Sequence, residues 1–316
     1  VLDSSEPFWY ESGMLQMIDS KRIDEIIKKY DFNHDYLAID DVGRYKGLRC
    51  PEDDSVFVEH RSAGVVLPVP LCKALQQACG DKLNIIRAEV EQIKRYDERW
   101  SCQSVDGQLF ETDTLIIASG VCVEDLDLEI DLPVEIIRGQ VAALNEVDAS
   151  ADLKKAVNAG KYFTPLINGM HYLGATYNRG VSDTSINDED NADLLTILNG
   201  FYPDTFDNED VVSSWAGFRL VTKDRVPIVG AVPDRAFFKQ EYEDIRHGNN
   251  QKSYAAARYK DGLYVSLAHG SRGFTSSLLS AEIIASQIEA EPLPVSDDVM
   301  AYLSPSRFIV NNLKRG

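Results

Sequence analysis

Hydrophobic and polar positions along this chain group into short blocks, either alternating or continuously apolar, separated by turn residues. In the first part of the chain, strands are predicted at residues 9–17 with a break at Gly13, and at 56–58, 64–67, 83–86, 90–96, 100–105, 109–110 and 114–118. In the later part, strands are predicted at residues 140–144, 162–167, 171–176, 211–218 and 263–268. The pattern therefore favours a chain rich in β-structure, with few helices.

Helical spacing of apolar residues is less common. Ser20 is placed to cap a first helix, and Pro68 with Pro70 to open a second. Further helices are predicted at residues 190–198 and after Thr275, where Thr275, Ser276 and Ser277 offer N-caps. Two polar segments, residues 31–55 and 235–253, are expected to be loops, the second a surface insertion whose order the sequence leaves open.

Two turns rich in small residues follow predicted strands. Gly270 and Gly273 bracket a turn between the strand at 263–268 and the last helix, and Arg272 lies inside it. Backbone N–H groups converge at a helix N-terminus and the helix dipole favours negative charge there, so a phosphate or another anion could bind. Ser119-Gly120 ends the strand at 114–118, where a cofactor could approach the backbone. Ordinary strand ends and a surface arginine explain the same residues about equally well.

Composition narrows the class of protein. With 316 residues, 44% hydrophobic and 26% charged, the chain can form two globular domains. No apolar run is long enough to span a membrane. The five cysteines and five histidines lack ligand spacing, so we expect no metal and a reduced, cytoplasmic setting. A net charge of −19 disfavours general nucleic-acid binding but leaves room for a local basic patch.

Several stretches together resemble one known family. They are the strand at 114–118 with Ser119-Gly120, then Arg138-Gly-Gln140, residues 162–176, residues 215–230, and His269-Gly-Ser-Arg-Gly273. Their order is similar to that of the FAD-dependent amine and amino-acid oxidases with the D-amino-acid oxidase and glycine oxidase fold. The resemblance implies a mixed α/β fold with an FAD-binding-type domain (61–138 and 262–316) and a mixed antiparallel-sheet substrate domain (1–60 and 139–261).

The resemblance also implies roles for particular residues. FAD is the expected cofactor and accepts a hydride from the carbon of a C–N bond. Its expected contacts are Val90, Ala118, Ser119, Gly120, Gly270, Arg272, Gly273, Phe274 and Thr275. Arg219 matches the family's carboxylate-binding arginine, with a structural ion pair as the alternative. Tyr162 and Tyr177 are weaker candidates for substrate contact, and no acid–base residue is assigned.

A closer likeness is to the oxidase half of bifunctional enzymes that modify the tRNA wobble uridine. Residues 269–277, Glu291-Pro-Leu-Pro294 and the ending from Leu303 to Gly316 carry it. It implies a tRNA partner bearing 5-carboxymethylaminomethyl-uridine, a methyltransferase domain on the same protein, and release of glyoxylate. The basic residues available for tRNA are Lys161, Arg179, Lys223, Arg225, Lys314 and Arg315, although scattered solvated charges explain them as well.

One departure from the family is a missing phosphate-binding motif. The family's FAD domain opens on a βαβ unit with G-x-G-x-x-G, and this chain contains no such motif and opens on Val1. The sequence therefore suggests a piece of a longer polypeptide, or a form unable to hold FAD. Two alternatives to tRNA modification stay open: an oxidase acting on a small free amine or amino acid, and a non-catalytic fragment.

Overall fold

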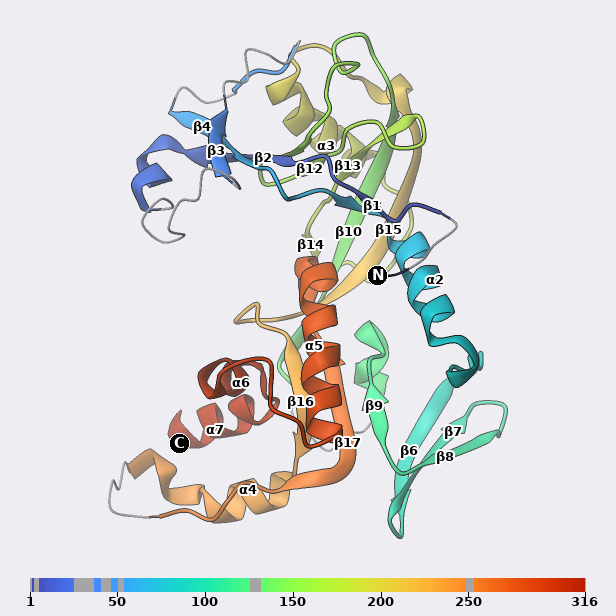
Figure 1. Cartoon of the computed structure of the whole chain (residues 1–316), viewed down its shortest axis with the longest axis vertical. Coiled ribbons are helices and arrows are strands. Elements are labelled where there is room, and N and C mark those ends of the chain that lie inside the picture. The colour runs from blue at the N-terminus through green and yellow to red at the C-terminus, as the bar shows by residue number, and fades with distance from the viewer. Residues whose placement is uncertain are drawn as a thin grey trace. The chain divides into compact units, whose positions relative to one another are not determined.

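The computed structural model describes residues 2, 6–25, 37–40, 47–50, 54–125, 132–247 and 253–315. The chain divides into two compact units (Figure 1). Unit 1 comprises Val1–Asn84 and Arg138–Gly217, and unit 2 comprises Ile85–Ile137 and Phe218–Gly316. The boundaries differ from those expected from the sequence, because residues 61–84 belong to unit 1 and residues 218–261 to unit 2.

Unit 1 is built on a long mixed sheet of order β14-β10-β13-β12-β11-β2-β4-β3, in which β15 also pairs with β10. Its strands are β2 (Met14–Asp19), β3 (Leu37–Asp40), β4 (Ser55–His60), β10 (Val134–Asn145), β11 (Ala156–Asn158), β12 (Tyr162–Phe163), β13 (Met170–Gly174), β14 (Asn178–Arg179) and β15 (Val211–Thr222). A separate short pair joins β1 (Trp9–Tyr10) to β5 (Val65–Val66). The pairs β1–β5, β2–β4, β3–β4, β10–β13, β11–β12 and β12–β13 are antiparallel, and the pair β2–β11 is parallel.

Helix α3 (Asp188–Phe201) packs on one face of this sheet. Asn187 caps it by accepting a hydrogen bond from the Glu189 amide, and acidic residues fill its first turn, where the helix dipole favours them. Leucines of α3 join strand residues in one buried cluster, which includes Leu15, Ala142, Leu144, Leu173, Leu194 and Leu198. Helix α2 (Pro68–Cys79) also belongs to this unit, and it begins at a proline as predicted.

The described part of unit 2 contains two small sheets. The first has the order β16-β17-β9, formed by β16 (Ile228–Pro233), β17 (Tyr259–Leu267) and β9 (Leu115–Ile117). The second is a meander of β6 (Val90–Tyr96), β7 (Arg99–Ser104) and β8 (Leu109–Thr112). The helices are α4 (Arg235–Glu241), α5 (Gly273–Ile288), α6 (Asp297–Leu303) and α7 (Ser306–Arg315). In the described residues, none of the helices is long and apolar enough to cross a membrane.

The structure corrects three expectations about secondary structure. Residues 31–55 were expected to be a loop, but Leu37–Asp40 forms β3 and pairs with β4. Residues 83–86 form no strand, and Leu83, Ile85 and Ile86 are exposed. Residues 235–247 are not a loose insertion: α4 is capped by Asp234, and Phe238 and Tyr242 are buried. The remainder of that segment, and the proposed helix beyond residue 25, lie outside the described residues.

Candidate functional site

The two small-residue turns lie at the same edge of the unit 2 sheet. Strands β9 and β17 are parallel, and their register pairs Ile117 with Val265. Parallel neighbours present their carboxyl ends at one edge, so Ala118-Ser119-Gly120 and the turn after Leu267 emerge side by side. Gly120 and Gly270 both adopt the left-handed region, with φ of 60° and 57°. A side chain at Gly120 would meet open space, which leaves the backbone accessible there.

His269 fastens the second turn to both elements that flank it. Its Nε2 lies 3.0 Å from Ser266 Oγ on β17, and its Nδ1 lies 2.9 Å from Ser276 Oγ on α5. The Ser276 hydroxyl donates to the Arg272 carbonyl, at 2.8 Å, so Ser276 accepts from His269 and the Ser266 hydroxyl donates to Nε2. Burial lowers the pKa of His269, which favours this neutral tautomer. In the sequence, His269 is visible only as part of a motif, without any sign of this role.

Helix α5 begins earlier than the sequence indicated. It starts at Gly273 with Arg272 at the N-cap position, and no side chain caps it. Thr275 and Ser276 do not cap the helix as expected; their hydroxyls donate instead to the Arg272 carbonyl. The first-turn amides of Gly273, Phe274 and Thr275 therefore have no side-chain acceptor from the cap residue, which suits an anionic ligand. Arg272 and Phe274 are exposed beside them.

The other expected FAD contact, Val90, opens β6 in the separate β6-β7-β8 sheet of the same unit. Eight of the nine expected cofactor residues thus belong to two neighbouring strand ends, and Val90 belongs to another sheet. Its role stays a prediction.

The three expected substrate residues come from different elements. Tyr162 lies in β12 and its ring covers Gly174, where an added Cβ would be 2.6 Å from Tyr162 Oη. Tyr177 is exposed, and the Arg179 guanidinium lies 5.8 Å from its ring centroid, which is a cation–π arrangement. Arg219 is half-buried in β15. Tyr162 and Tyr177 belong to unit 1 and Arg219 to unit 2.

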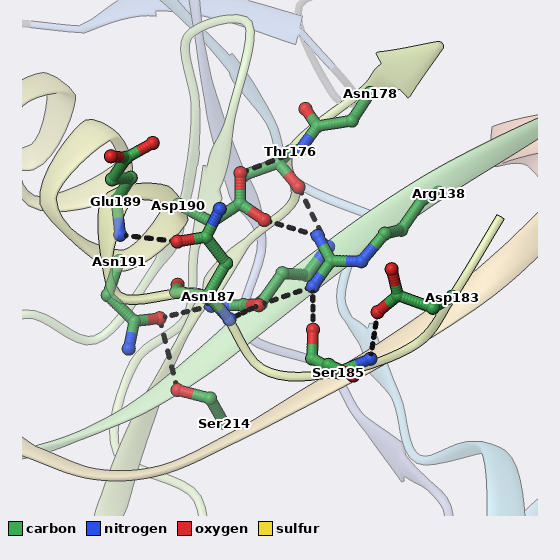
Figure 2. Close-up of polar contacts among 11 residues, drawn as sticks. Arg138, Thr176, Asn178, Asp183, Ser185, Asn187, Glu189, Asp190, Asn191 and Ser214 are labelled. Atoms are coloured by element: carbon green, nitrogen blue, oxygen red, sulfur yellow. Dashed lines mark hydrogen bonds and ion pairs between the residues drawn. The ribbon is translucent and has the colours of Figure 1, made fainter. Parts of the chain in front are cut away.

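A buried polar network anchors the segment that carries Tyr177 (Figure 2). Arg138 of β10 forms an ion pair with Asp190 of α3 and donates to the Ser185 carbonyl. The side chain of Gln140 donates to the Asn187 carbonyl at 2.8 Å, and its backbone amide donates to Thr176 Oγ1.

The same network holds the segment at Asn178, whose side-chain amide donates to Asp190 Oδ1 at 2.6 Å. Residues 176–187 are therefore fixed near both ends by three buried side chains, Arg138, Gln140 and Asp190. Arg138-Gly-Gln140 is visible in the sequence as a family pattern, but its partners are not, because they lie about 50 residues further along the chain.

The basic residues expected to meet tRNA are divided between the two units. Lys161 and Arg179 belong to unit 1, whereas Lys223, Arg225, Lys314 and Arg315 belong to unit 2. Lys161 donates to the Ala175 carbonyl at 2.6 Å. Lys223 and Arg225 flank Asp224, which is paired with Arg307 at 3.1 Å, and Lys314 and Arg315 occupy the last turn of α7.

Solved structures define the fold class of this architecture. Glycine oxidase from Geobacillus kaustophilus superposes with a TM-score of 0.74 at 20% identity, covering 95% of this chain and 75% of that one. Iminodiacetate oxidase from Chelativorans sp. BNC1 superposes with a TM-score of 0.73, also at 20% identity, covering 94% of this chain and 76% of that one. The fold is thus that of the glycine oxidase type, as the sequence resemblance implied.

The chain belongs to the DAO family of FAD-dependent oxidoreductases, whose family model matches residues 6–287. It is similar to the tRNA 5-methylaminomethyl-2-thiouridine biosynthesis bifunctional protein MnmC of Pseudomonas syringae pv. tomato, with 33% identity over 80% of this chain and 39% of that protein. It is 28% identical to the protein of the same name from Campylobacter concisus over 95% of this chain and 46% of that protein. The chain therefore spans less than half the length of these curated relatives.

FAD is the cofactor of this family, and the residues present fit part of it. The adjacent turns at Gly120 and Gly270, together with the uncapped start of α5, provide accessible backbone and a favourable electrostatic end for an anionic group. The 316 residues contain no G-x-G-x-x-G, so they supply no glycine-rich cradle of that kind for the pyrophosphate.

Proposed function

We propose that this chain is the FAD-dependent oxidase part of a protein that modifies the tRNA wobble uridine. In this proposal it oxidises 5-carboxymethylaminomethyl-(2-thio)uridine and leaves 5-aminomethyl-(2-thio)uridine and glyoxylate. The observation that carries the proposal is the pair of glycine turns on the parallel strands β9 and β17, in a chain whose relatives are named for thiouridine biosynthesis in tRNA.

The chemistry balances with FAD, oxygen and water. When bound, FAD supplies a two-electron acceptor for the C–N bond of the substrate's carboxymethylamino group. Water then hydrolyses the resulting imine to the primary amine and glyoxylate, and oxygen takes up the two electrons as hydrogen peroxide. The chain's own contribution is to orient the amine and to exclude bulk water. No side chain has to abstract a proton if the amine is neutral before hydride loss.

Particular residues take roles in this proposal. The turns at residues 118–120 and 270–275 contact FAD, and Val90 meets its adenine end. Unit 2 is then the FAD-binding unit. Arg219 holds the substrate carboxylate, because a planar guanidinium can bind a carboxylate through two hydrogen bonds. Tyr162 and Tyr177 contact the remainder of the substrate.

The proposal also names partners. The tRNA presents its wobble uridine to this chain, and a methyltransferase domain acts from the same polypeptide, as the word bifunctional in the relatives' names suggests. The setting is the cytoplasm, where tRNA is modified. The positive charges available for tRNA phosphates are those of Lys161 before β12, Arg179 in β14, Lys223 and Arg225 in the β15–β16 turn, and Lys314 and Arg315 at the end of α7.

Glyoxylate release tests this function most simply. The purified protein is loaded with FAD and supplied with carboxymethylaminomethyl-tRNA, and glyoxylate is measured alongside the same assay with glycine or iminodiacetate. The tRNA should be oxidised with the higher kcat/KM. Faster oxidation of the small amines would favour the free-substrate alternative, and no oxidation of any of them by flavin-loaded protein would contradict oxidase function.

Arg219→Ala is the informative variant in the same assay. Loss of one partner of a buried charge pair costs about 2–5 kcal/mol, so kcat/KM should fall by at least about 30-fold on the 1.4 kcal/mol per decade scale. Arg99→Ala is a matched control, because Arg99 is an exposed arginine that pairs with Glu111 and Asp113 at the surface and has no proposed role in binding. Equal kcat/KM for the Arg219 and Arg99 variants would remove the clamp role from Arg219 without affecting the wider proposal.

A further inference from the structure

One face of the long sheet in unit 1 carries aromatic and small residues. Leu173 of β13 packs into the cluster with α3, so strand alternation directs Tyr172 and Gly174 to the opposite face. The register pairs Tyr172 with Ala143 and Gly174 with Tyr162. Paired residues point to the same side of a sheet, so all four of these residues share the face that α3 does not cover.

Trp215 of β15 joins this face. Its neighbour Ser214 donates a hydrogen bond to Asn191 Oδ1 of α3, at 3.0 Å, so alternation directs Trp215 away from α3. The rings of Tyr172 and Trp215 are 6.3 Å apart between centroids, with their planes inclined by 36°. Strand β10 lies between β13 and β15, so the two rings meet across β10.

These aromatic rings are more exposed than they would be if they served only to cover the sheet. Ala143 beneath them is fully buried, yet Trp215 keeps 52% of its surface exposed and Tyr162 keeps 40%. Gly174 adds no side chain and lets Tyr162 lie close to the sheet. Tyr162, Tyr172 and Trp215 thus form an aromatic row whose rings are at least partly exposed, and the small residues Ala143 and Gly174 lie beneath it.

The charges near this row suit a nucleic acid. The exposed Arg179 lies in β14, which is a neighbour of β10, and its guanidinium lies 5.8 Å from the ring centroid of the exposed Tyr177. A cation beside an exposed aromatic ring stands out in a chain with a net charge of −19. Exposed aromatic side chains with nearby cations are the arrangement that binds unpaired bases, because the rings stack on the base while the cations meet phosphates.

We propose that Tyr172 and Trp215 form a stacking platform for an unpaired nucleobase of the substrate RNA. This inference rests on the proposed function and adds the residues that recognise the base. The platform binds the planar ring, whereas the carboxylate of the substrate is left to Arg219. It explains how an enzyme with a small-amine oxidase fold favours an amine attached to a pyrimidine.

Tryptophan fluorescence tests the platform without requiring turnover. The chain has three tryptophans, of which Trp100 is buried, and Trp9 and Trp215 are 43% and 52% exposed. An anticodon stem-loop RNA with a single-stranded loop should quench the fluorescence of wild-type protein and of Trp9→Phe, but not of Trp215→Phe. Quenching that survives in Trp215→Phe and disappears in Trp9→Phe would overturn the proposal.

Affinity provides the second measurement. Trp215→Leu keeps an apolar cover over Ala143 but removes the stacking surface, so the dissociation constant for the stem-loop should rise roughly 5- to 150-fold, whereas Trp215→Phe should rise much less. Tyr172→Leu and Tyr172→Phe should repeat this order. Circular dichroism confirms that each variant is folded.

Together, the binding and oxidation assays distinguish a failure of the stacking platform from a failure of the proposed function on which it rests. If wild-type protein oxidises the modified tRNA and Trp215→Leu binds the stem-loop as tightly as Trp9→Phe does, the platform is wrong and the function stands. If wild-type protein neither binds nor oxidises any RNA, the proposed function fails and the platform fails with it. A fully paired duplex RNA with the sequence of the stem should bind wild-type protein and Trp215→Leu alike.

Discussion

At the scale of single residues, the arginine of Arg138-Gly-Gln140 shows how a motif becomes a structural anchor. Arg138 is 2% exposed and meets Asp190, Gln140 and the Ser185 carbonyl in one network (Figure 2). A buried arginine is tolerated only when its charge is matched, and the bonds from Nη1 and Nη2 match the charge of Arg138 here. The network thereby fixes residues 176–187, which include the candidate substrate residue Tyr177, to β10 and α3.

Removing one side of the buried pair should be costly. Asp190→Asn and Arg138→Leu should each lower the free energy of unfolding by about 3–5 kcal/mol, because the remaining charge is left buried and unmatched. The double variant should lose less than the sum of the two, which a double-mutant cycle measured by urea denaturation would reveal. Strict additivity of the two losses would contradict direct coupling.

The matched control is the surface pair Lys21–Asp54. Its side chains are 76% and 74% exposed at 3.2 Å, so water screens the interaction. Lys21→Ala should change the free energy of unfolding by no more than about 0.5 kcal/mol. A loss as large as that of Asp190→Asn would mean that burial does not explain the contribution of the Arg138–Asp190 pair to the free energy of unfolding.

At the scale of elements, strand alternation and turn signals predicted much of the fold, and tertiary packing decided the rest. The hairpin around Asp106-Gly107, helix α2 at Pro68 and the strand–turn–helix of β17 and α5 follow from local sequence. The sequence pattern failed at residues 235–247 because α4 is short and strongly charged. Its stability comes from packing between Phe238 and Ile309 of α7, which no local pattern reveals.

The candidate site, too, can be predicted from the sequence only in part. The glycine turns at residues 118–120 and 270–273 are visible in the sequence, since positive φ angles select glycine. The hydrogen bonds that hold the second turn are not, because His269 links Ser266 and Ser276 by contacts that depend on the start of α5. The partners of Arg138 and the pairing of Tyr172 with Trp215 likewise require sheet register and long-range contacts.

We expect helix α4 to stabilise the fold, as a loose surface insertion would not. Phe238 is 2% exposed, and its ring lies 5.1 Å from that of Tyr242. Phe238→Ala should therefore lower the free energy of unfolding by about 3–5 kcal/mol through lost burial and a cavity. Lys239→Ala, at the exposed neighbouring position, should have an effect of about 0.5 kcal/mol or less. Urea denaturation of both variants checks this, and equal small effects would mean that α4 contributes little to the fold.

At the scale of the whole molecule, three histidines link folding to pH. Burial is the main cause that lowers the pKa of His60, His171 and His269. For His171, a hydrogen bond to the Thr164 carbonyl and the Glu146 charge oppose this shift without reversing it. Each histidine therefore takes up a proton less readily in the folded chain than in the unfolded chain, whose pKa is about 6.5.

The sign of the effect follows from that difference. The stability contributed by the neutral histidines is complete above about pH 6.5 and is lost as the pH falls towards the lower folded-state pKa values. The free energy of unfolding should thus be smaller at pH 5.5 than at pH 7.5. His171→Asn keeps a donor for the Thr164 carbonyl but cannot titrate, so the difference between the two pH values should shrink. An unchanged difference in that variant would contradict the contribution of His171.

The most direct test of the central claim couples flavin binding to glyoxylate release in one preparation. The purified protein is incubated with FAD, freed of unbound flavin, and examined by its absorption spectrum before carboxymethylaminomethyl-tRNA is added. The expected result is a bound flavin spectrum that bleaches when the tRNA is added without oxygen, with one glyoxylate released for each flavin reduced. A protein that retains flavin but whose spectrum and glyoxylate yield are unchanged by the tRNA would contradict the account.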